Sequence, residues 1–596
     1  MPIRFPSLYG LTVRGREVLA RFPLVLLAGA VAAAAGIVAT TDHASDDWAR
    51  AAMVAALGLP LFTALAFVAE VRSWPRSRHL AVAALASAAL VGFWFAWPGP
   101  DLKHHAIRYF QLSAALHLLV AFLPFVGQAE SSAFWQYNRR LFLSFLRAVV
   151  FSGVLFVGLA IALAALDKLF GLDVDEEIYL RLWLVSAFVV NTWIFLAGVP
   201  GNIPELAADR DYPRALKVFT QYILTPLVAV YLLILLAYLV KILVTGQWPS
   251  GWIGYLVTSV AVAGLLGFLL VHPLSDDPDE GWIRTFRRWL FIGLIPAALM
   301  LLAAFAKRIA PYGLTELRYL GVLLGVWLLV IAVLYSLRRN QGIRIIPLSL
   351  ALLLLATLFG PAGATHRAVA SQAKRLTREV AAAQASPSPG LISPAEAEAS
   401  GALRFLVEHR ALGSIASAFD GRIPGDVVIP DTLRFRTDSL ARAIMTAASL
   451  DYTRQSTAEG QMAGHFSYHA DRDAMAIEGY RWMVPVRFQD TTSVRLGADS
   501  VRFAFDSLAQ RLRAELQSGA ALEFDLGALV KQLGAVPGLD AERTTIPAES
   551  LQVFPRDGAA AGHLLLTWIN GRHQDGDARI EGLNGYLLIG PAAPAP

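Results

Sequence analysis

Long apolar runs dominate the first part of this chain, and polar residues gather in the short segments between them. The clearest run extends from Phe219 to Val244, and Lys241, near one end, is its only formally charged residue. It exceeds the roughly 20 apolar residues that a helix needs to cross the core of a bilayer. A helix on the surface of a soluble protein has a polar face, whereas this run is apolar on every face. The pattern therefore predicts a helix that is surrounded by lipid.

The same criterion predicts about eleven membrane-spanning helices within residues 1–362. The predicted spans are Phe22–Thr40, Ala51–Val71, Leu80–Trp97, Phe110–Gln128, Leu141–Leu166, Ile178–Val199, Phe219–Val244, Trp252–Val271, Trp289–Ala306, Tyr319–Leu337 and Ile345–Ala362. Arginines precede the first span, as they do in a secretory signal, but its apolar run is longer than a signal core and further spans follow at once. We therefore expect an uncleaved first helix.

The charges between the spans indicate the orientation of the chain. With the N-terminus inside, the segments predicted to be cytoplasmic hold about twice as many Arg and Lys residues as the opposite segments do. An odd number of spans places the two ends of the chain on opposite sides. We therefore predict a cytoplasmic N-terminus and an extracytoplasmic C-terminal portion, and one missed or additional span would reverse the second of these.

The chain becomes polar after residue 362, which indicates structure outside the bilayer. Residues 363–429 are interpreted as an exit helix and a linker region, with ASPSPGLISPAEAEAS at residues 385–400 as its flexible part. Residues 430–590 mix helical and strand patterns, and residues 591–596 are interpreted as a disordered tail. The predicted fold is thus mainly α, a polytopic helical bundle that carries a C-terminal α+β domain.

Two short sequence patterns recur within residues 430–590, and this internal repetition predicts a tandem duplication. In one pattern an alternating strand is followed by an Asp that can cap a helix, and the pattern is found at Leu433–Ala443, Val501–Arg511 and, more weakly, Leu522–Leu533. A second pattern, Ile-Glu-Gly before an apolar strand, is found in Asp473–Met483 and Asp577–Leu587. Chance similarity between such short stretches is the alternative.

Composition narrows the classes of partner. The chain is 56% hydrophobic and only 16% charged, with a pI near 9.3. Its basic residues lie mostly in loops between spans, where orientation in the membrane explains them, so we expect no nucleic-acid partner. It has no cysteine, which excludes disulfides and thiolate chemistry.

Polar residues inside the predicted spans are the first candidates for function, because polarity in lipid is costly. His117 lies near the centre of its span and could serve an ion path, although a histidine hydrogen-bonded between helices is the simpler interpretation. Gln221 lies near the start of its span, and Lys241 lies where a lysine can extend to the head groups. Broken helices can also bind ions, or prolines can simply kink them, and the prolines within spans are Pro60, Pro124, Pro226 and Pro296.

No set of residues assembles an acid, a base and a nucleophile. His465 and His469 share one face of a strand or of a helix, but two imidazoles without a third ligand make a poor metal site. The chain has no GxSxG, no GxxxxGK[ST] and no GxGxxG that opens a helix after a strand. We therefore expect no catalytic residues, no metal and no cofactor.

The loop Lys307–Arg318, KRIAPYGLTELR, is the most distinctive polar stretch between spans. It combines three cations with Tyr312, Glu316 and a Pro-Tyr-Gly turn at the predicted outer interface. A structural hairpin explains it, with Tyr312 and Arg318 anchoring helix ends. A site for a lipid phosphate or for a partner, formed by Tyr312, Glu316 and Arg318, is the alternative.

Four stretches of the chain resemble the bacterial membrane family known as domain of unknown function 4153. They are FWQYN at Phe134–Asn138, Leu216–Tyr238, PYGLTELRYL at Pro311–Leu320 and SQAKRL at Ser371–Leu376. The resemblance covers roughly residues 110–380. It implies a polytopic inner-membrane protein with a periplasmic C-terminal domain, and it carries neither an activity nor functional residues with it.

Our hypothesis is a non-enzymatic component of the cell envelope that serves assembly, sensing or scaffolding. Its expected partners are the lipid bilayer and envelope proteins that bind the periplasmic domain. A transporter of a lipid-linked or anionic solute, using His117 or Gln221, is the first alternative. A membrane-embedded transferase that uses Glu316 and Arg318 is the second.

Overall fold

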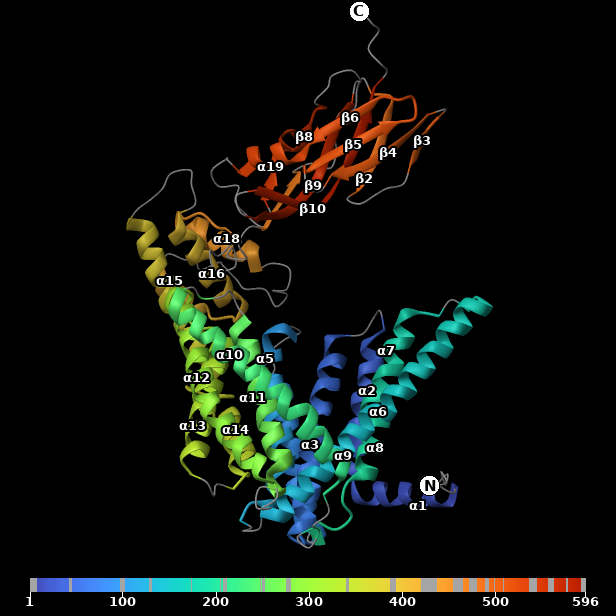
Figure 1. Ribbon diagram of the computed structural model, residues 1–596, viewed down its shortest axis with the longest axis vertical. Helices are drawn as coiled ribbons and strands as arrows, with labels where there is room; N and C mark the ends of the chain where they lie inside the picture. The colour runs from blue at the N-terminus through green and yellow to red at the C-terminus, as the bar shows by residue number, and fades with distance from the viewer. Residues whose placement is uncertain are drawn as a thin grey trace, which may run out of the picture. The chain divides into compact units, whose positions relative to one another are not determined.

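The computed structural model describes residues 8–41, 45–96, 102–127, 131–172, 174–203, 205–206, 209, 212–246, 248, 252–274, 280–338, 342–385, 393–419, 437–453, 465–470, 480–487, 493–497, 499–506, 509–534, 544–555, 562–574 and 577–590. The chain divides into two compact units, Met1–Ser371 and Gln372–Pro596. The first is helical, and the second contains helices followed by β-sheets (Figure 1).

Helices run in succession through the first unit. They are α1 (Leu8–Arg21), α2 (Pro23–Ala39), α3 (Asp46–Val71), α4 (Arg76–Phe95), α5 (Leu102–Phe122), α6 (Ser131–Phe170), α7 (Glu176–Val185), α8 (Asn191–Gly198), α9 (Arg214–Phe219), α10 (Thr225–Thr245), α11 (Trp252–Val271), α12 (Gly281–Tyr312), α13 (Glu316–Leu337) and α14 (Ile345–Ala356). A π-helical turn, Ser186–Val190, joins α7 to α8, and another, Thr220–Leu224, joins α9 to α10. The next helix, α15 (Ala364–Ala385), begins in the first unit and ends in the second.

The predicted spans correspond to these helices, although several helices extend beyond the apolar run. Within the described residues, nine helices are long and apolar enough to cross a membrane, and the bent pair α1–α2 raises the number to ten. Its two parts meet at 96°. The last predicted span, Ile345–Ala362, forms the shorter α14, which ends at Ala356. Mainly helical architecture with several long apolar helices and a β-rich C-terminal region is thus confirmed.

Large apolar side chains cover the outside of the first unit. On α6, Val154 and Ile161 are 68% and 64% exposed, and on α10 Leu243 is 74% exposed. The interior contains aliphatic side chains and aromatic rings, such as Phe67 and Tyr137, whose ring centroids lie 5.4 Å apart in an edge-to-face pair. The unit is therefore apolar on both its inner and its outer surfaces.

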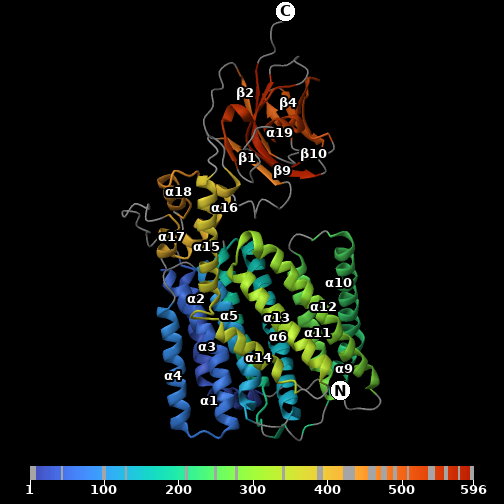
Figure 2. The same ribbon diagram turned by 90° about the vertical axis from the view of Figure 1, so that its left-hand side faces the viewer.

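Glycines allow the closest helix contacts in this unit. Helices α2 and α3 pack along each other (Figure 2), where Gly58 of α3 faces Ala28 of α2. Gly29 of α2 faces the Phe188 carbonyl of the π-helical turn Ser186–Val190. Helix α13 packs on α12 with Gly321 against the ring of Phe305. Small residues bring helix backbones together in this way when no polar face directs the packing.

The helical part of the second unit contains the C-terminal portion of α15 with α16 (Pro394–Glu408), α17 (Leu412–Ala418) and α18 (Thr437–Ala447). Helix α16 begins inside the stretch predicted to be a flexible linker, and this part of the prediction was wrong. Ser393 and Glu396 form a capping box: the Ser393 hydroxyl accepts from the Glu396 amide at 3.2 Å, and the Glu396 carboxylate accepts from the Ser393 amide at 2.7 Å. Reciprocal capping starts a helix that a composition rich in Pro, Ser and Ala conceals.

Two sheets form the β-rich part of the second unit. The strands are β1 (His465–Ala470), β2 (Trp482–Arg487), β3 (Val494–Leu496), β4 (Asp499–Asp506), β5 (Arg511–Leu516), β6 (Ala521–Asp525), β7 (Thr544–Ile546), β8 (Gln552–Val553), β9 (Gly562–Gln574) and β10 (Asp577–Ile589), and α19 is Leu526–Gly534. One sheet has the order β2-β10-β9-β1-β7 with β8 beside β9, and the other has the order β3-β4-β5-β6. Side chains of both sheets and of α19 share one apolar core.

The copies of the first repeated pattern form different structures. At Leu522–Leu533, strand β6 leads into α19, and the Asp525 carboxylate accepts from the Ala528 amide at 2.9 Å, as the pattern predicts. At Val501–Arg511, strand β4 ends at Asp506, which pairs with Arg511 at the start of β5, so the helix predicted there was wrong. The Asp506 carboxylate accepts from the Ala509 amide at 3.0 Å. The first copy continues into α18, but residues 433–436 lie outside the described part, as do residues 473–479 of the Ile-Glu-Gly pattern and the tail 591–596. The duplication therefore stays a prediction.

Replacing Gly321 by Ala should destabilise the first unit, because a methyl group there would collide with the Phe305 ring. Such overpacking costs about 1–3 kcal/mol. The matched control is Gly92→Ala in α4, where nothing lies within 4 Å of the added methyl group. Thermal unfolding of the full chain in detergent should show a lower midpoint for Gly321→Ala only. Equal midpoints for the two variants would contradict the α12–α13 packing.

Candidate functional site

The loop between α12 and α13 gathers three of the residues predicted from the sequence. Helix α12 ends at Tyr312, the chain turns at Gly313 with a φ of 70°, and α13 begins at Glu316. The Arg318 guanidinium donates to the Gly313 carbonyl at 2.9 Å and lies 5.9 Å from the Tyr312 ring centroid. A cation at the C-terminal carbonyls of a helix is favourable, so Arg318 closes the end of α12.

The same loop is bound to the start of α15. The Thr365 hydroxyl donates to the Glu316 carboxylate, and the Leu314 amide donates to the Ser371 hydroxyl at 2.9 Å. We call Tyr312, Glu316, Arg318, Thr365 and Ser371 the loop cluster. It joins the PYGLTELRYL stretch to the SQAKRL stretch, two of the sequences that carry the family resemblance.

The loop cluster is built for anchoring. Glu316 is 5% exposed, so its carboxylate is removed from any substrate in solution. Arg318 is bound to backbone carbonyls. A general acid or base has to reach the reacting group within hydrogen-bond distance. The geometry therefore favours the structural interpretation of Glu316 and Arg318.

The other three predicted residues lie apart from this cluster. His117 is on the exposed side of α5, and its Nδ1 lies 2.8 Å from the Ser113 carbonyl of its own helix. Lys241 is exposed on α10, one turn before the helix ends at Thr245. Gln221 is half-buried within the π-helical turn Thr220–Leu224. The structure brings none of these three together.

Two consecutive candidate spans contain a π-helical turn. One turn precedes Asn191, whose side-chain oxygen accepts from the Ser152 hydroxyl at 3.3 Å. The other precedes Pro226, which cannot donate a backbone hydrogen bond, so a shifted ladder accommodates it. Such turns are frequent at functional sites.

A second polar cluster lies at the start of α6, in the FWQYN stretch and the two arginines after it. Three of its side chains reach backbone carbonyls of other segments: Trp135 donates to Leu269 at 2.7 Å and Tyr137 donates to Val120 at 2.8 Å. Asn138 donates to Ala121 at 3.0 Å. The stretch therefore ties α6 to the ends of α5 and α11.

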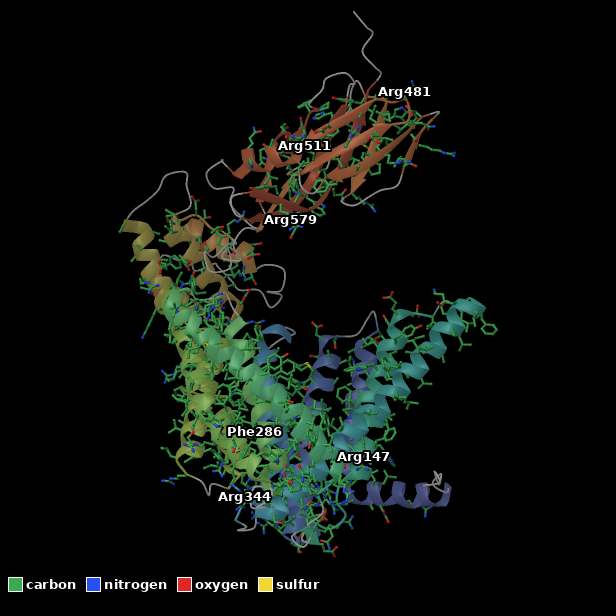
Figure 3. All side chains as sticks on the ribbon, viewed as in Figure 1. Arg147, Phe286, Arg344, Arg481, Arg511 and Arg579 are labelled. Atoms are coloured by element: carbon green, nitrogen blue, oxygen red, sulfur yellow. The ribbon has the colours of Figure 1, made fainter. Side chains whose placement is uncertain are left out.

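Asp209 completes this second cluster. Its carboxylate lies 3.4 Å from the Arg139 guanidinium and 2.8 Å from that of Arg140. Arg139 is buried and Arg140 is half-exposed. Nearby segments are joined similarly, since the Arg344 guanidinium (Figure 3) donates to the Phe125 carbonyl at 2.9 Å. We call Trp135, Tyr137, Asn138, Arg139 and Asp209 the α6 clamp.

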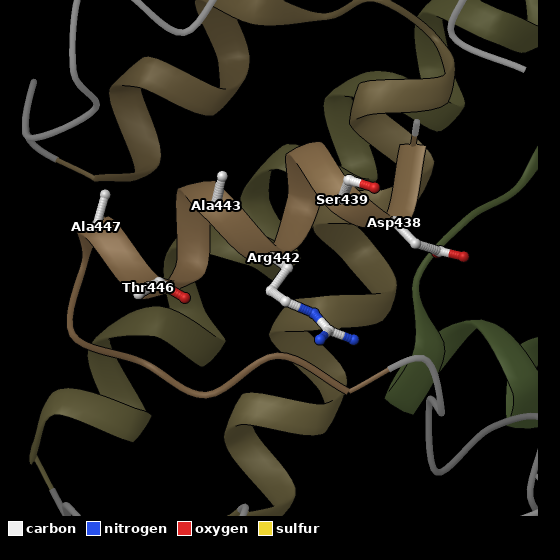
Figure 4. A pocket seen from close by; sticks show the side chains of 6 residues that line it. All are labelled: Asp438, Ser439, Arg442, Ala443, Thr446 and Ala447. Atoms are coloured by element: carbon white, nitrogen blue, oxygen red, sulfur yellow. The ribbon is translucent and has the colours of Figure 1, made fainter. Parts of the chain in front are cut away.

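In the second unit, one face of α18 lines a hollow of about 760 Å³ (Figure 4). The lining residues are Asp438, Ser439, Arg442, Ala443, Thr446 and Ala447. Asp438 accepts from the Tyr452 hydroxyl at 2.7 Å, and Arg442 lies 5.8 Å from the Tyr452 ring centroid. Both charged residues thus contact the same tyrosine.

The pKa values of several ionisable side chains of the second unit are shifted, among them those of Glu396 and His563. Burial alone would raise the pKa of Glu396, but hydrogen bonds from Asp451 and Ser393 lower it below its ordinary value. Burial lowers the pKa of His563, whose ring stacks on Phe554 at 4.3 Å between centroids. His469 is half-buried and lies 6.4 Å from Trp568. Among the described residues, no three His, Cys, Asp or Glu side chains gather closely enough to hold a metal ion.

Sequence reasoning missed residues that meet partners far away in the chain. Asp209 lies between two predicted spans, in a segment without a recognisable motif. Gln111 is the second residue of the predicted span Phe110–Gln128 and was not singled out. The Gln111 amide donates to the Thr357 hydroxyl at 2.9 Å and to the Leu354 carbonyl at 2.7 Å. A polar residue inside an apolar run was the available signal for Gln111. Nothing in the sequence pointed to Asp209.

The fold and these clusters define a class: a mainly helical protein whose long apolar helices are joined by polar side chains, with a β-rich C-terminal region. The chain belongs to the family described as Domain of unknown function (DUF4153), whose match covers residues 24–378. It is 25% identical over 309 residues to an uncharacterized protein of Pasteurella multocida (strain Pm70). That similarity covers 51% of this chain and 50% of the relative, so the chain spans about half the length of that protein. No solved structure gives a significant match.

Removing the Tyr137 hydroxyl should weaken the α6 clamp. Tyr137→Phe leaves the Val120 carbonyl without its donor at a fully buried position, which costs about 1–2 kcal/mol. Tyr231→Phe is the control, because Tyr231 lies 46% exposed on α10. Thermal unfolding of the full chain should show a lower midpoint for Tyr137→Phe alone. An unchanged midpoint would contradict a stabilising role for this contact.

Proposed function

We propose that this chain is a multi-pass protein of the bacterial inner membrane whose helical unit anchors a non-enzymatic binding unit of the cell envelope. One observation carries the proposal: the described polar clusters join helices to one another, while large apolar side chains face outwards. Soluble monomers rarely expose apolar patches larger than a few hundred Å². Lipid around the helices accounts for this surface, and assembly, sensing or scaffolding is the role that needs no catalytic set.

The distribution of arginines supports a cytoplasmic N-terminus. Arg21 pairs with Glu70 at 2.6 Å and also donates to the Pro200 carbonyl, and Arg72 donates to the Val126 carbonyl at 3.0 Å. These contacts lie where α1 and α3 end and thus at one end of the bundle. A surplus of Arg on one side is the bias expected of a cytoplasmic face. The helix ends on the opposite side, and the C-terminal unit after them, are then periplasmic.

An exposed apolar surface on the larger sheet supports a protein partner. Met483 and Pro485 alternate along the same face of β2, and Tyr586 of β10 is the register partner of Pro485. Met483 is 52% exposed and Tyr586 is 37% exposed. Met and Tyr are enriched in protein interfaces relative to other surfaces.

Partner capture tests the proposal directly. We expect crosslinked membranes to yield a specific envelope protein with the full chain, and to lose it when residues 386–596 are deleted or when Met483→Ser and Tyr586→Ser are combined. The control Arg513→Ser, at an exposed position of β5 in the other sheet, should retain it. All variants should remain in the membrane fraction. The proposal would be contradicted if the full chain were soluble without detergent. It would also be contradicted if the same partners were captured with and without residues 386–596.

Transport of a lipid-linked or anionic solute is the second candidate, because π-helical turns interrupt two consecutive candidate spans and one of them holds Gln221. If this candidate is correct, Gln221→Ala should reduce solute flux into vesicles that contain the purified chain. Tyr222→Ala, at the adjacent and 67% exposed position, is the matched control. His117→Ala should leave the flux unchanged, since His117 faces away from the other helices. Equal flux with Gln221→Ala and Tyr222→Ala would remove Gln221 from the path.

The transferase is the least supported alternative. It requires Glu316 and Arg318 to reach a substrate, whereas Glu316 is buried against Thr365 and Arg318 is bound to the end of α12.

A further inference from the structure

A cavity of about 300 Å³ lies beside the loop cluster, where α5 begins and where α14 is followed by α15. Its lining residues are Arg108, Leu358, Phe359, Gly360, Pro361, Gly363, Thr365 and His366. All of them belong to the first unit. We call this the Arg108 cavity. Its volume is at the lower end of the range for sites that hold small molecules.

Three hydrogen bonds to α5 and α13 fix the walls of the Arg108 cavity. Gln111 donates to the Thr357 hydroxyl at 2.9 Å, Tyr319 donates to the Ala362 carbonyl at 2.9 Å, and Thr365 donates to Glu316. The turn between these anchors has Gly360 at a φ of 74°. A site whose walls are already held in place loses less conformational freedom when a ligand binds.

The lining combines one cation, Arg108, with apolar surface. The Arg108 guanidinium lies 5.6 Å from the ring centroid of Phe359, and no carboxylate of the described residues pairs with it. His366 is exposed at the rim. An arginine that stacks on an aromatic ring keeps its N–H donors at the edge of the guanidinium plane, where they suit a phosphate group.

An apolar stripe continues from the cavity along α14. Leu352, Leu355 and Phe359 are spaced three and four residues apart and are all exposed, at 57%, 36% and 50%. This spacing places the two leucines on one face of the helix, below the aromatic wall of the cavity. A hydrocarbon chain that lies along this stripe would have its polar end at Arg108.

We propose that the Arg108 cavity binds the phosphate group of an anionic phospholipid, whose acyl chain lies along Leu352 and Leu355. The proposal assumes the membrane location argued above, but it needs no protein partner and no transport. Glu316 does not oppose the phosphate directly, because its carboxylate is held by the Thr365 hydroxyl. In this arrangement the loop cluster is the support that keeps the phosphate site in shape.

The test measures binding of fluorescent short-chain phosphatidylglycerol to the full chain in detergent. Arg108→Gln should weaken binding about tenfold, as expected for loss of a charge-assisted contact with phosphate. Phe359→Ala should weaken it as well, by removing the aromatic wall. The matched control is Arg367→Gln, which removes an exposed charge from the same turn of α15 without altering the lining of the cavity. Arg108→Lys is included because it keeps the positive charge. The size-exclusion elution profiles of Arg108→Gln and Arg108→Lys are compared with that of the unchanged chain to detect a folding defect.

Separate arms identify the source of the phosphate. Phosphatidylcholine of the same chain length should compete weakly, and inorganic phosphate should compete only at far higher concentration than the lipid. Equal competition by inorganic phosphate would assign the cavity to the free ion and overturn the lipid assignment. Equal weakening by Arg108→Gln and Arg367→Gln would show a general surface charge effect, and unchanged binding in Arg108→Gln would refute the site. Because binding is measured in detergent, a wrong membrane orientation would leave these outcomes unchanged.

Discussion

Satisfaction of polar groups inside an apolar body is the constraint on which the helical unit depends. A buried donor or acceptor without a partner costs about 1–3 kcal/mol, and in lipid no water can replace the partner. The chain meets this constraint with side chains that reach carbonyls of other segments, such as Trp135 on Leu269 and Gln111 on Leu354. Each contact satisfies a donor and at the same time fixes where two helices meet, which apolar packing alone specifies poorly.

The stretches that resemble the family form hydrogen bonds of this kind between segments. In FWQYN three neighbouring side chains hold three different carbonyls, and in PYGLTELRYL the start of α13 holds the start of α15 through Glu316. These residues are polar because they connect segments, and their distinctive appearance in the sequence does not require catalysis. The family description brings no activity with it, and this geometry explains why motifs alone would not reveal one.

Sequence alone predicted the helices well, because the length and uniform polarity of an apolar run are local properties. Prediction from the sequence was wrong where one short pattern forms a helix at one position and a different structure at another. An Asp after an alternating strand caps α19 at Asp525 but only a turn at Asp506, where pairing of β4 with β5 prevails over local helix formation. It also failed at α16, whose capping box lies within a stretch that composition marks as a linker. The lining of the Arg108 cavity could not be predicted, because α5 meets the α14–α15 connection only in the folded chain.

The arginines that connect helices differ from Arg108 in the groups that they contact. The buried Arg139 faces the Asp209 carboxylate, and the half-buried Arg318 donates to the Gly313 carbonyl at the end of α12. The Arg108 guanidinium instead lies 5.6 Å from the centroid of the Phe359 ring, and no carboxylate of the described residues pairs with it. In the proposed site, Arg108 lies beside a cavity, where its guanidinium is the cation that a phosphate group would contact. If the proposed phosphate site is correct, the hydrogen bonds that connect α5 and α13 to the α14–α15 connection also hold the walls of that site in place.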